Sequence, residues 1–360
     1  MLLPKERLPI KSILLIGLLP NFLKKLIYRM KGYKIGKKVS LGLGSVIIGK
    51  EVQIGDYASL GFLTIIRGTQ IHIGAHVAIG STTFLDTPYL EIGEGSRINE
   101  QVFVGGLQFP DSKLVVGKNC QIMQMSFINP ARSIRIGDDT GIGGHSLIFG
   151  HSSWLSQFEG YPVEFEPIEI GNSVSLAWRV FVLPGTKIGD GAVIGANSLV
   201  HRTIPPKCLA VGFPARVVSK YPEFPQEISG EKKGEILQNI LKEMMDFFNK
   251  SGLDCVPTGR GIEVRNKNRS WMGERAKIWR LQVLYEQTEE QSPIELAEGV
   301  HVLLSLNKIP ESLREICQAK KIMWIDIEKK EQSKYWNDLG EEVLLFLKRY
   351  GVRFIRVQKG

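Results

Sequence analysis

The sequence predicts a mainly β fold, a parallel β-helix of about eight coils, because a six-residue repeat runs from about residue 35 to residue 200. Aliphatic residues recur at every sixth position, and many of them precede glycine, as in Ile54–Gly55. A small or β-branched residue often follows four positions later, as at Ala58. A helix repeats near 3.6 residues and a strand near 2, so neither alone gives this period. A coil of three short strands joined by tight corners gives a period of six, because each strand with its corner takes six residues. Each coil stacks its aliphatic side chains inward and pairs with the next coil.

Residues 1–34 precede the repeat and are predicted to form an amphipathic, basic helical segment. Its apolar run ends at Pro20 and is shorter than the roughly 20 residues that span a bilayer. It lacks a cleavage site of the signal-peptide type, so we expect it to be retained. Two roles stay open, a helix on an anionic membrane and a helix that caps the first coil, and one helix can serve both. A single acid, Glu6, accompanies the basic residues Lys5, Arg7, Lys11, Lys24, Lys25, Arg29, Lys31, Lys34, Lys37 and Lys38.

Residues 35–222 form the predicted β-helix domain, and its repeat is interrupted mainly at one corner. The two longest interruptions are residues 105–112 and residues 149–167. Both follow the third strand of a coil, so we expect both loops to leave the prism at the same edge, two coils or about 10 Å apart. Long loops on a rigid scaffold commonly carry binding and catalytic residues.

Three stretches, Phe149–Trp154, Val182–Asp190 and Val211–Arg216, resemble the hexapeptide-repeat acyltransferases. The resemblance is to the maltose and galactoside O-acetyltransferases and to the acetyltransferases of polysaccharide biosynthesis. It implies a left-handed β-helix, with acetyl-CoA or another acyl-CoA as co-substrate and no metal. It also implies a homotrimer whose active sites form between prisms.

The resemblance makes His151 the candidate general base, because a histidine at the start of the corresponding loop takes the proton of the acceptor hydroxyl. Imidazole titrates near neutrality, so it can accept that proton and pass it to the departing thiolate. The thioester is already activated, and direct transfer therefore needs no Ser or Cys nucleophile. His145, in the same coil, is a candidate orienting residue. Asn129 and Trp154 are candidate acceptor-binding residues, although Asn129 before Pro130 also fits a simple turn.

Five residues of the last coils are candidates for binding acyl-CoA: Trp178, Ala196, His201, Arg202 and Arg216. Each arginine could meet a phosphate with its planar fork of donors, but a solvent-exposed role fits equally well. Related enzymes more often have Trp where this chain has Ser175, and a small residue where it has Trp178. We expect Trp178 either to reshape the donor groove or to pack between neighbouring subunits.

Other functions remain compatible with the repeat. A γ-class carbonic anhydrase needs three imidazoles around a metal. His145 and His151 are six residues apart and lie on different faces, which leaves only His72 or His76 as a third ligand. An N-acyltransferase acting on an amino sugar would use the same base, and a structural or assembly role also stays open. The acyltransferase-like stretches favour acyl transfer over the metal enzyme.

Residues 223–360 lack the repeat and are predicted to form a smaller α/β domain. A helical stretch over residues 231–250 comes first, and helical patterns separate the last three apolar runs, so we expect a βαβαβ arrangement. The domain has no glycine-rich phosphate loop and no nucleophile elbow. Its role is therefore inferred from position only, as acceptor recognition or partner docking. The apolar runs cover residues 278–285, 300–306, 321–327 and 352–357.

The net charge of +9 suits membrane phosphates, CoA phosphates or a nucleotide-linked sugar. Nucleic acid is not expected, because no recognised binding module accompanies the charge. Cys120, Cys208, Cys255 and Cys317 are dispersed and fit a reducing cytoplasm. We therefore predict a cytoplasmic O-acyltransferase, most simply an O-acetyltransferase. Its acceptor is expected to be a sugar, a nucleotide-sugar or a lipid-linked glycan, at the inner face of the membrane.

Overall fold

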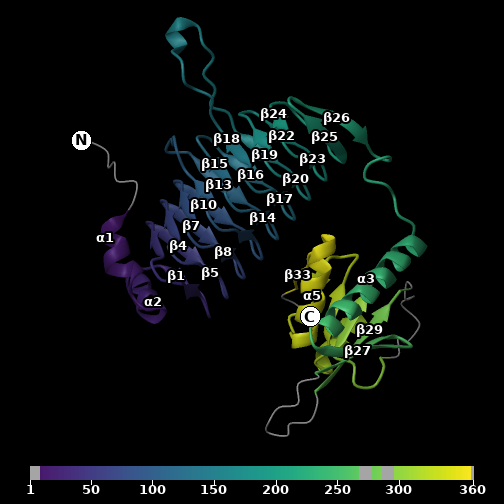
Figure 1. Ribbon diagram of the computed structural model, residues 1–360. Helices are drawn as coiled ribbons and strands as arrows, with labels where there is room; N and C mark the ends of the chain where they lie inside the picture. The colour runs from purple at the N-terminus through teal and green to yellow at the C-terminus, as the bar shows by residue number, and fades with distance from the viewer. Residues whose placement is uncertain (1–8, 267–276, 286–295, 358–360) are drawn as a thin grey trace. The chain divides into compact units, whose positions relative to one another are not determined.

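A computed structural model describes residues 9–266, 277–285 and 296–357 of the chain (Figure 1). The chain divides into two compact units, Met1–Gln226 and Glu227–Gly360. Among the basic and acidic residues noted at the N-terminus, Lys5, Glu6 and Arg7 lie outside the described residues.

The first unit is a three-sided parallel β-helix, so the predicted left-handed β-helix class is confirmed. Sheet A consists of β1 (Lys34–Ile35), β4 (Glu51–Ile54), β7 (Gln70–Ile73), β10 (Tyr89–Ile92), β13 (Lys113–Val116), β16 (Ile134–Ile136), β19 (Ile168–Ile170) and β22 (Lys187–Ile188). Sheet B consists of β2 (Ser40–Leu41), β5 (Ser59–Leu60), β8 (Ala78–Ile79), β11 (Arg97–Ile98), β14 (Gln121–Ile122), β17 (Gly141–Ile142), β20 (Ser175–Leu176), β23 (Val193–Ile194), β25 (Cys208–Gly212) and β26 (Ala215–Lys220). Sheet C consists of β3 (Val46–Ile48), β6 (Ile65–Arg67), β9 (Phe84–Asp86), β12 (Phe103–Val104), β15 (Phe127–Asn129), β18 (Leu147–Phe149), β21 (Phe181–Val182) and β24 (Leu199–Val200).

The six-residue repeat sets the register of these sheets. In sheet A, Ile54 pairs with Ile73, and Ile73 pairs with Ile92, all three being buried. The strands alternate between buried and more exposed positions, as in β4, because successive side chains of a strand point to opposite faces. The aliphatic core therefore continues from coil to coil along the prism.

Two of the three corners are tight turns that place a residue in the left-handed backbone region. The corner from sheet A to sheet B does so at Lys38, Tyr57, His76, Asn119, Asp139, Ser173 and Lys207. The corner from sheet B to sheet C does so at Leu63, Thr82, Gln101, Met125, His145, Arg179 and Asn197. Both long loops leave from the third corner, between sheets C and A, because they connect β12 to β13 and β18 to β19.

The N-terminal helices cap the first coil of the prism. They are α1 (Ile10–Ser12), a π-helical turn η1 (Ile13–Gly17) and α2 (Asn21–Met30). In Figure 1 they lie at the β1 end of the prism. Within the part of the chain that the structure describes, no helix combines the length and the apolar character needed to cross a bilayer.

Side chains of α2 replace the strand partners that a preceding coil would supply. The hydroxyl of Tyr28 accepts a hydrogen bond from the backbone N–H of Ile47, at 2.9 Å. The ammonium of Lys24 donates to the carbonyl oxygens of Gly42, at 2.6 Å, and Ser45, at 3.2 Å. Tyr28 and Lys24 are both fully buried. The structure therefore shows the capping role that the sequence left open beside membrane binding.

The second unit contains a seven-stranded mixed sheet, in agreement with the predicted α/β class. Its strands run in chain order across the sheet: β27 (Leu253–Thr258), β28 (Gly261–Asn266), β29 (Ile278–Leu284), β30 (Val302–Ser305), β31 (Met323–Asp326), β32 (Glu331–Gln332) and β33 (Ile355–Arg356). The helical segments are α3 (Gly230–Lys250), α4 (Glu311–Ala319), α5 (Asp338–Leu347) and the 3₁₀ turn η3 (Lys348–Tyr350). β29, β30 and β31 are parallel, while β27 and β28 form an antiparallel hairpin that the sequence did not predict. The predicted βαβαβ arrangement is wrong in its last strand, because β32 pairs antiparallel with β31 and lies between β31 and β33.

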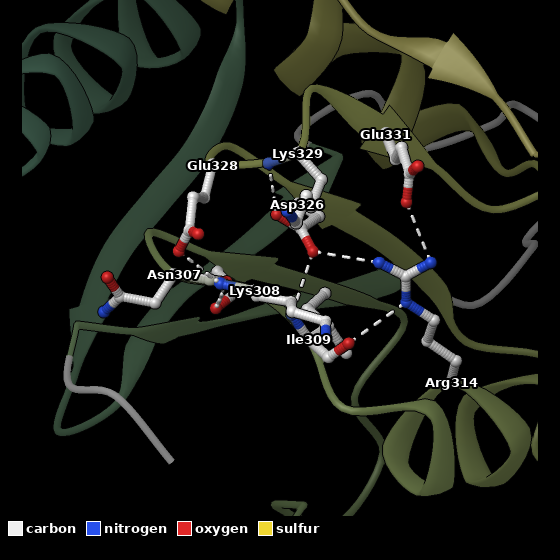
Figure 2. Close-up of polar contacts among 9 residues, drawn as sticks. Asn307, Lys308, Ile309, Arg314, Asp326, Glu328, Lys329 and Glu331 are labelled. Atoms are coloured by element: carbon white, nitrogen blue, oxygen red, sulfur yellow. Dashed lines mark hydrogen bonds and ion pairs between the residues drawn. The ribbon is translucent and has the colours of Figure 1, made fainter. Parts of the chain in front are cut away.

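A buried polar network joins α4 to the end of β31 (Figure 2). Asp326 is fully buried and accepts hydrogen bonds from the N–H of Ile309, at 2.8 Å, and the N–H of Lys329, at 2.9 Å. The guanidinium of Arg314 lies 3.1 Å from Asp326 and 2.8 Å from Glu331. Every charge of this network is paired, so its role is structural: it fixes α4 on the sheet.

Candidate active site

The two long loops meet at the corner between sheets C and A. β12 and β18, which lead into them, are separated by β15 alone, so the predicted two-coil spacing is confirmed. The longer loop carries the 3₁₀ turn η2 (Gln157–Glu159) and stands out from the prism (Figure 1). The loops touch through Phe109 and Phe165, whose ring centroids are 5.2 Å apart in an edge-to-face contact.

His151 lies at the base of the longer loop, two residues after β18. Ser152 and Glu164 exchange two backbone hydrogen bonds of 2.9 Å, which hold the two sides of the loop together. The residues next to this pair are His151 and Phe165, and their rings stack with centroids 6.2 Å apart. The ring of Phe149 lies 5.9 Å from the imidazole on the strand side. An aromatic wall therefore fixes the orientation of His151.

This apolar setting keeps the imidazole neutral. Burial lowers the pKa of His151 from its ordinary value of 6.5, because the aromatic wall solvates a charge poorly. Its Nδ1 is buried without a hydrogen-bond partner among the described residues. A neutral imidazole has one nitrogen that can accept a proton, which is what a general base requires.

Asn129 is the second unsatisfied polar group at this corner. It ends β15, pairs in register with Phe149 and is 3% exposed. Its Oδ1 has no hydrogen-bond partner among the described residues. Because His151 follows two residues after Phe149, the partner of Asn129 on the neighbouring strand, the Cα atoms of Asn129 and His151 are within about 10 Å of each other. Asn129 is thus a buried amide whose oxygen has an unused capacity to accept a hydrogen bond.

The shorter loop covers the Asn129 side chain. Gly106 has a φ of +113°, and a Cβ added there would lie 2.4 Å from Nδ2 of Asn129. The loop is fastened by Arg132, which pairs with Asp111 at 3.1 Å and stacks over Phe109 with 4.3 Å between Cζ and the ring centroid. A glycine at position 106 is therefore needed for this close approach.

Other predicted residues lie at the opposite corner, between sheets B and C. His145 is exposed there, and its ring lies 5.9 Å from Trp178, which is 44% exposed. A Cβ on Gly144 would meet the Trp178 ring at 2.6 Å, so the glycine leaves room for the indole. Ala196 is exposed at the same corner in the next coil. Since β18 separates His145 from His151, the structure does not bring these two histidines together within one chain.

The remaining candidates are all exposed, but they are spread over the last coils and the longer loop. His201 and Arg202 follow β24, whereas Arg216 lies on β26. Trp154 lies in the longer loop with 97% of its surface exposed, so it contacts little of its own chain.

Sequence reasoning missed an aromatic ladder on the outer face of sheet C. Phe84 stacks on Phe103 and Phe103 on Phe127, with centroids 5.1 and 5.0 Å apart. Phe127 lies 5.1 Å from Phe149, so the ladder leads to the imidazole of His151. Phe84, Phe103 and Phe127 each directly precede an inward-facing aliphatic residue of the repeat. This shared position in the repeat is the sequence signal that could have revealed the ladder.

The histidines of the prism are dispersed over different corners and strands. Over the described ranges 9–266, 277–285 and 296–357, no group of three or more His, Cys, Asp or Glu side chains is placed to hold a metal ion. His76 stacks on Tyr57 with centroids 4.9 Å apart, and His72 lies 3.6 Å from Glu51.

Comparisons with known proteins give relatives for part of the chain. No family model matches it. It is 37% identical over 114 residues to "Putative lipopolysaccharide biosynthesis O-acetyl transferase WbbJ" of Escherichia coli (strain K12), over 29% of this chain and 58% of that protein. It is 47% identical over 76 residues to "Putative acetyltransferase SAV2555" of Staphylococcus aureus (strain Mu50), over 21% of this chain and 35% of that protein. The chain therefore spans 58% and 35% of the lengths of these curated relatives.

Among solved structures, a hexapeptide-repeat acetyltransferase of Vibrio cholerae complexed with acetyl coenzyme A is 20% identical. The match covers 58% of this chain and 83% of that chain, with a TM-score of 0.25. The predicted resemblance to acetyltransferases is confirmed by the names of the sequence relatives.

Proposed function

We propose that the protein is an acyl-CoA-dependent O-acyltransferase, most simply an O-acetyltransferase, that modifies a sugar hydroxyl with His151 as general base. The observation that carries the proposal is the pairing of two unsatisfied groups beside the two loops. His151 has a lowered pKa and an unpartnered Nδ1, and Asn129 has a buried, unpartnered Oδ1. One sugar hydroxyl could donate a hydrogen bond to Asn129 Oδ1, while a neighbouring hydroxyl of the same sugar is deprotonated by His151. The relatives named as acetyltransferases support the same reaction class.

In the proposed reaction His151 moves one proton, and the acyl group passes directly from CoA to the acceptor. The neutral imidazole takes the proton of the acceptor hydroxyl while its oxygen attacks the thioester carbonyl carbon and forms the new C–O bond. The C–S bond of the tetrahedral intermediate then breaks, and the imidazolium returns the proton to the CoA thiolate. The products are an acyl ester and free CoA thiol. Base catalysis of this kind contributes about 10² to 10⁴ in rate.

We propose that the donor site is completed by a second prism of a homotrimer. His145, Trp178 and Ala196 lie at a different corner from His151, so one chain alone does not place them around the base. Contact between two prisms would bring one corner of each together. The longer loop supports this arrangement, because Trp154 is 97% and Phe158 104% exposed, as expected of side chains that pack on another chain. Arg202 and Arg216 would then be exposed cations for the CoA phosphates, and His201 would be a further hydrogen-bond donor.

The acceptor is proposed to be a sugar in a glycan precursor, either nucleotide-linked or lipid-linked, at the cytoplasmic face of the membrane. The aromatic ladder supports a ring-shaped acceptor, because it forms an apolar strip on the outer face of sheet C that ends at Phe149, whose ring lies 5.9 Å from the imidazole of His151. The relative named for lipopolysaccharide biosynthesis supports a glycan acceptor.

The proposal is tested by incubating the purified protein with acetyl-CoA and a panel of sugars, nucleotide-sugars and amino sugars. Free thiol and the mass of the acylated product are then measured. We expect thiol release that depends on a hydroxyl acceptor, and a product bond that mild alkali cleaves, as it does an ester. An alkali-stable amide on an amino sugar would instead show N-acyl transfer. Absence of any acyl-CoA binding by calorimetry would refute the acyltransferase assignment.

A further inference from the structure

The N-terminal helices present an apolar stripe on the side that does not cap the prism. In α2, Phe22, Leu26 and Met30 are four residues apart and therefore share one face. They are 68%, 54% and 79% exposed, whereas Lys24 and Tyr28 on the opposite face are fully buried against the first coil. The N-terminal apolar stripe consists of Ile10, Leu14, Leu15, Leu18, Phe22, Leu26 and Met30.

The charge around this stripe is of one sign. Residues 9–31, which include the N-terminal helices, contain no Asp or Glu, but they contain five Lys and Arg residues. Lys24 alone among the five is buried, in the cap. The others are Lys11, Lys25, Arg29 and Lys31. An exposed apolar stripe bordered by cations and free of acids is complementary to a surface that is apolar inside and anionic at its rim.

We propose that the N-terminal apolar stripe docks on the surface of a membrane that contains anionic phospholipid. An amphipathic helix of this kind lies in the interface with its apolar face among the acyl chains. Cations next to it gain from the anionic headgroups. A second copy of the chain fits less well, because a two-fold contact through the stripe would bring two sets of cations together. This inference goes beyond the location proposed above, since it assigns the docking surface and the lipid chemistry, and it does not depend on acyl transfer.

The cap restricts how the inference can be tested. Deleting the N-terminal segment would remove Tyr28 and Lys24 from the end of the prism, and a loss of binding would then also report unfolding. Substitutions on the exposed face avoid this problem. The triple variant Phe22→Glu, Leu26→Glu, Met30→Glu changes side chains that are 54% exposed or more. Leu345→Glu is the matched control, because Leu345 is 50% exposed on α5 of the second unit.

The experiment is flotation of the full chain with phosphatidylcholine vesicles, with and without phosphatidylglycerol. We expect binding to the anionic vesicles, weaker binding as salt increases, and little binding to the neutral ones. The triple variant should lose at least about tenfold in binding, while Leu345→Glu binds as the native chain does. Lys25→Gln with Lys31→Gln should weaken binding to anionic vesicles by about 30-fold, from about fivefold per cation.

Three results would overturn the inference. The native chain could fail to float with anionic vesicles, or the folded triple variant could float as well as the native chain. The third result would be self-association through the stripe. Light scattering would then give the triple variant a smaller mass than the native protein, while its vesicle binding stays unchanged. Thermal unfolding of each variant, measured beside the flotation, establishes that it is folded.

Discussion

Replacing Asn129 by Leu should stabilise the protein while impairing its activity. Leucine has a branched shape close to that of asparagine, and it removes a buried oxygen that has no partner among the described residues. An unsatisfied buried polar group costs about 1–3 kcal/mol, so the free energy of unfolding should rise by up to that amount. For a unit the size of Met1–Gln226, this corresponds to a rise in Tm of roughly 2–12 °C.

The same substitution should lower kcat/KM, because a hydroxyl of the acceptor sugar next to the reacting one loses its hydrogen-bond partner. A loss of about 1–3 kcal/mol corresponds to roughly a 5- to 150-fold decrease. Calorimetry measures the first effect, and thiol release with saturating acetyl-CoA measures the second. A rise in stability together with a fall in kcat/KM is the result expected of a polar group that is kept unsatisfied in order to bind a ligand.

Thr140→Val is the matched control for this prediction. Thr140 is also fully buried, but its hydroxyl donates to the carbonyl of Gly171, at 2.8 Å, and accepts from the N–H of Val174, at 3.2 Å. The same polar-to-apolar change should therefore destabilise the fold by about 1–3 kcal/mol and leave kcat/KM unchanged. If Asn129→Leu also lowers Tm and leaves activity intact, Asn129 is a structural residue and our reasoning is wrong.

Four further predictions concern the base, the shorter loop and, twice, the cap. Burial lowers the pKa of His151 below 6.5, so the base stays neutral above that pH. A profile of kcat against pH should therefore be flat above pH 6.5 and fall only below it. An apparent pKa above 6.5 would contradict the apolar setting of His151. Gly106→Ala should lower both kcat/KM and Tm, because the added Cβ would meet the Asn129 side chain. Gly160→Ala is the control: Gly160 also has a positive φ, +86°, but an added Cβ there would have no atom within 4 Å, so kcat/KM should not change. Tyr28→Phe leaves the buried N–H of Ile47 without a partner and should cost about 1–3 kcal/mol in urea unfolding, a loss that an unchanged midpoint would refute. Burial raises the pKa of Tyr28 from 10.0 to about 12. Between pH 10 and pH 12 the unfolded state therefore releases the phenol proton while the folded state keeps it. The free energy of unfolding of the native protein, relative to Tyr28→Phe, should decline as pH rises from 10 to 12.

The prism was predictable from the sequence because its core is built from one repeated contact. Ile54, Ile73 and Ile92 occupy equivalent positions in successive coils, so the period alone gives their burial and their register. The corner at which the loops leave follows from where the period is interrupted. His151 is at that corner because it begins the longer loop.

The contacts that complete the site were not predictable in this way, because they join segments with no common period. Nothing in the sequence places Phe165, at the far end of the longer loop, against the imidazole of His151. Lys24 is a similar case: a lysine in a basic segment suggests an exposed cation, but the carbonyls at the open end of the prism provide acceptors that bury it. His145 shares a coil with His151, yet the corner geometry separates them.

The most direct test of the central claim is acetyl-CoA turnover by the native protein and by His151→Ala, each after metal chelation and with a hydroxyl acceptor present. If His151 is the general base, native turnover should survive chelation, and the variant should lose about 10² to 10⁴ in rate while still binding acetyl-CoA. A variant that retains native turnover would contradict the assignment of His151 as the base.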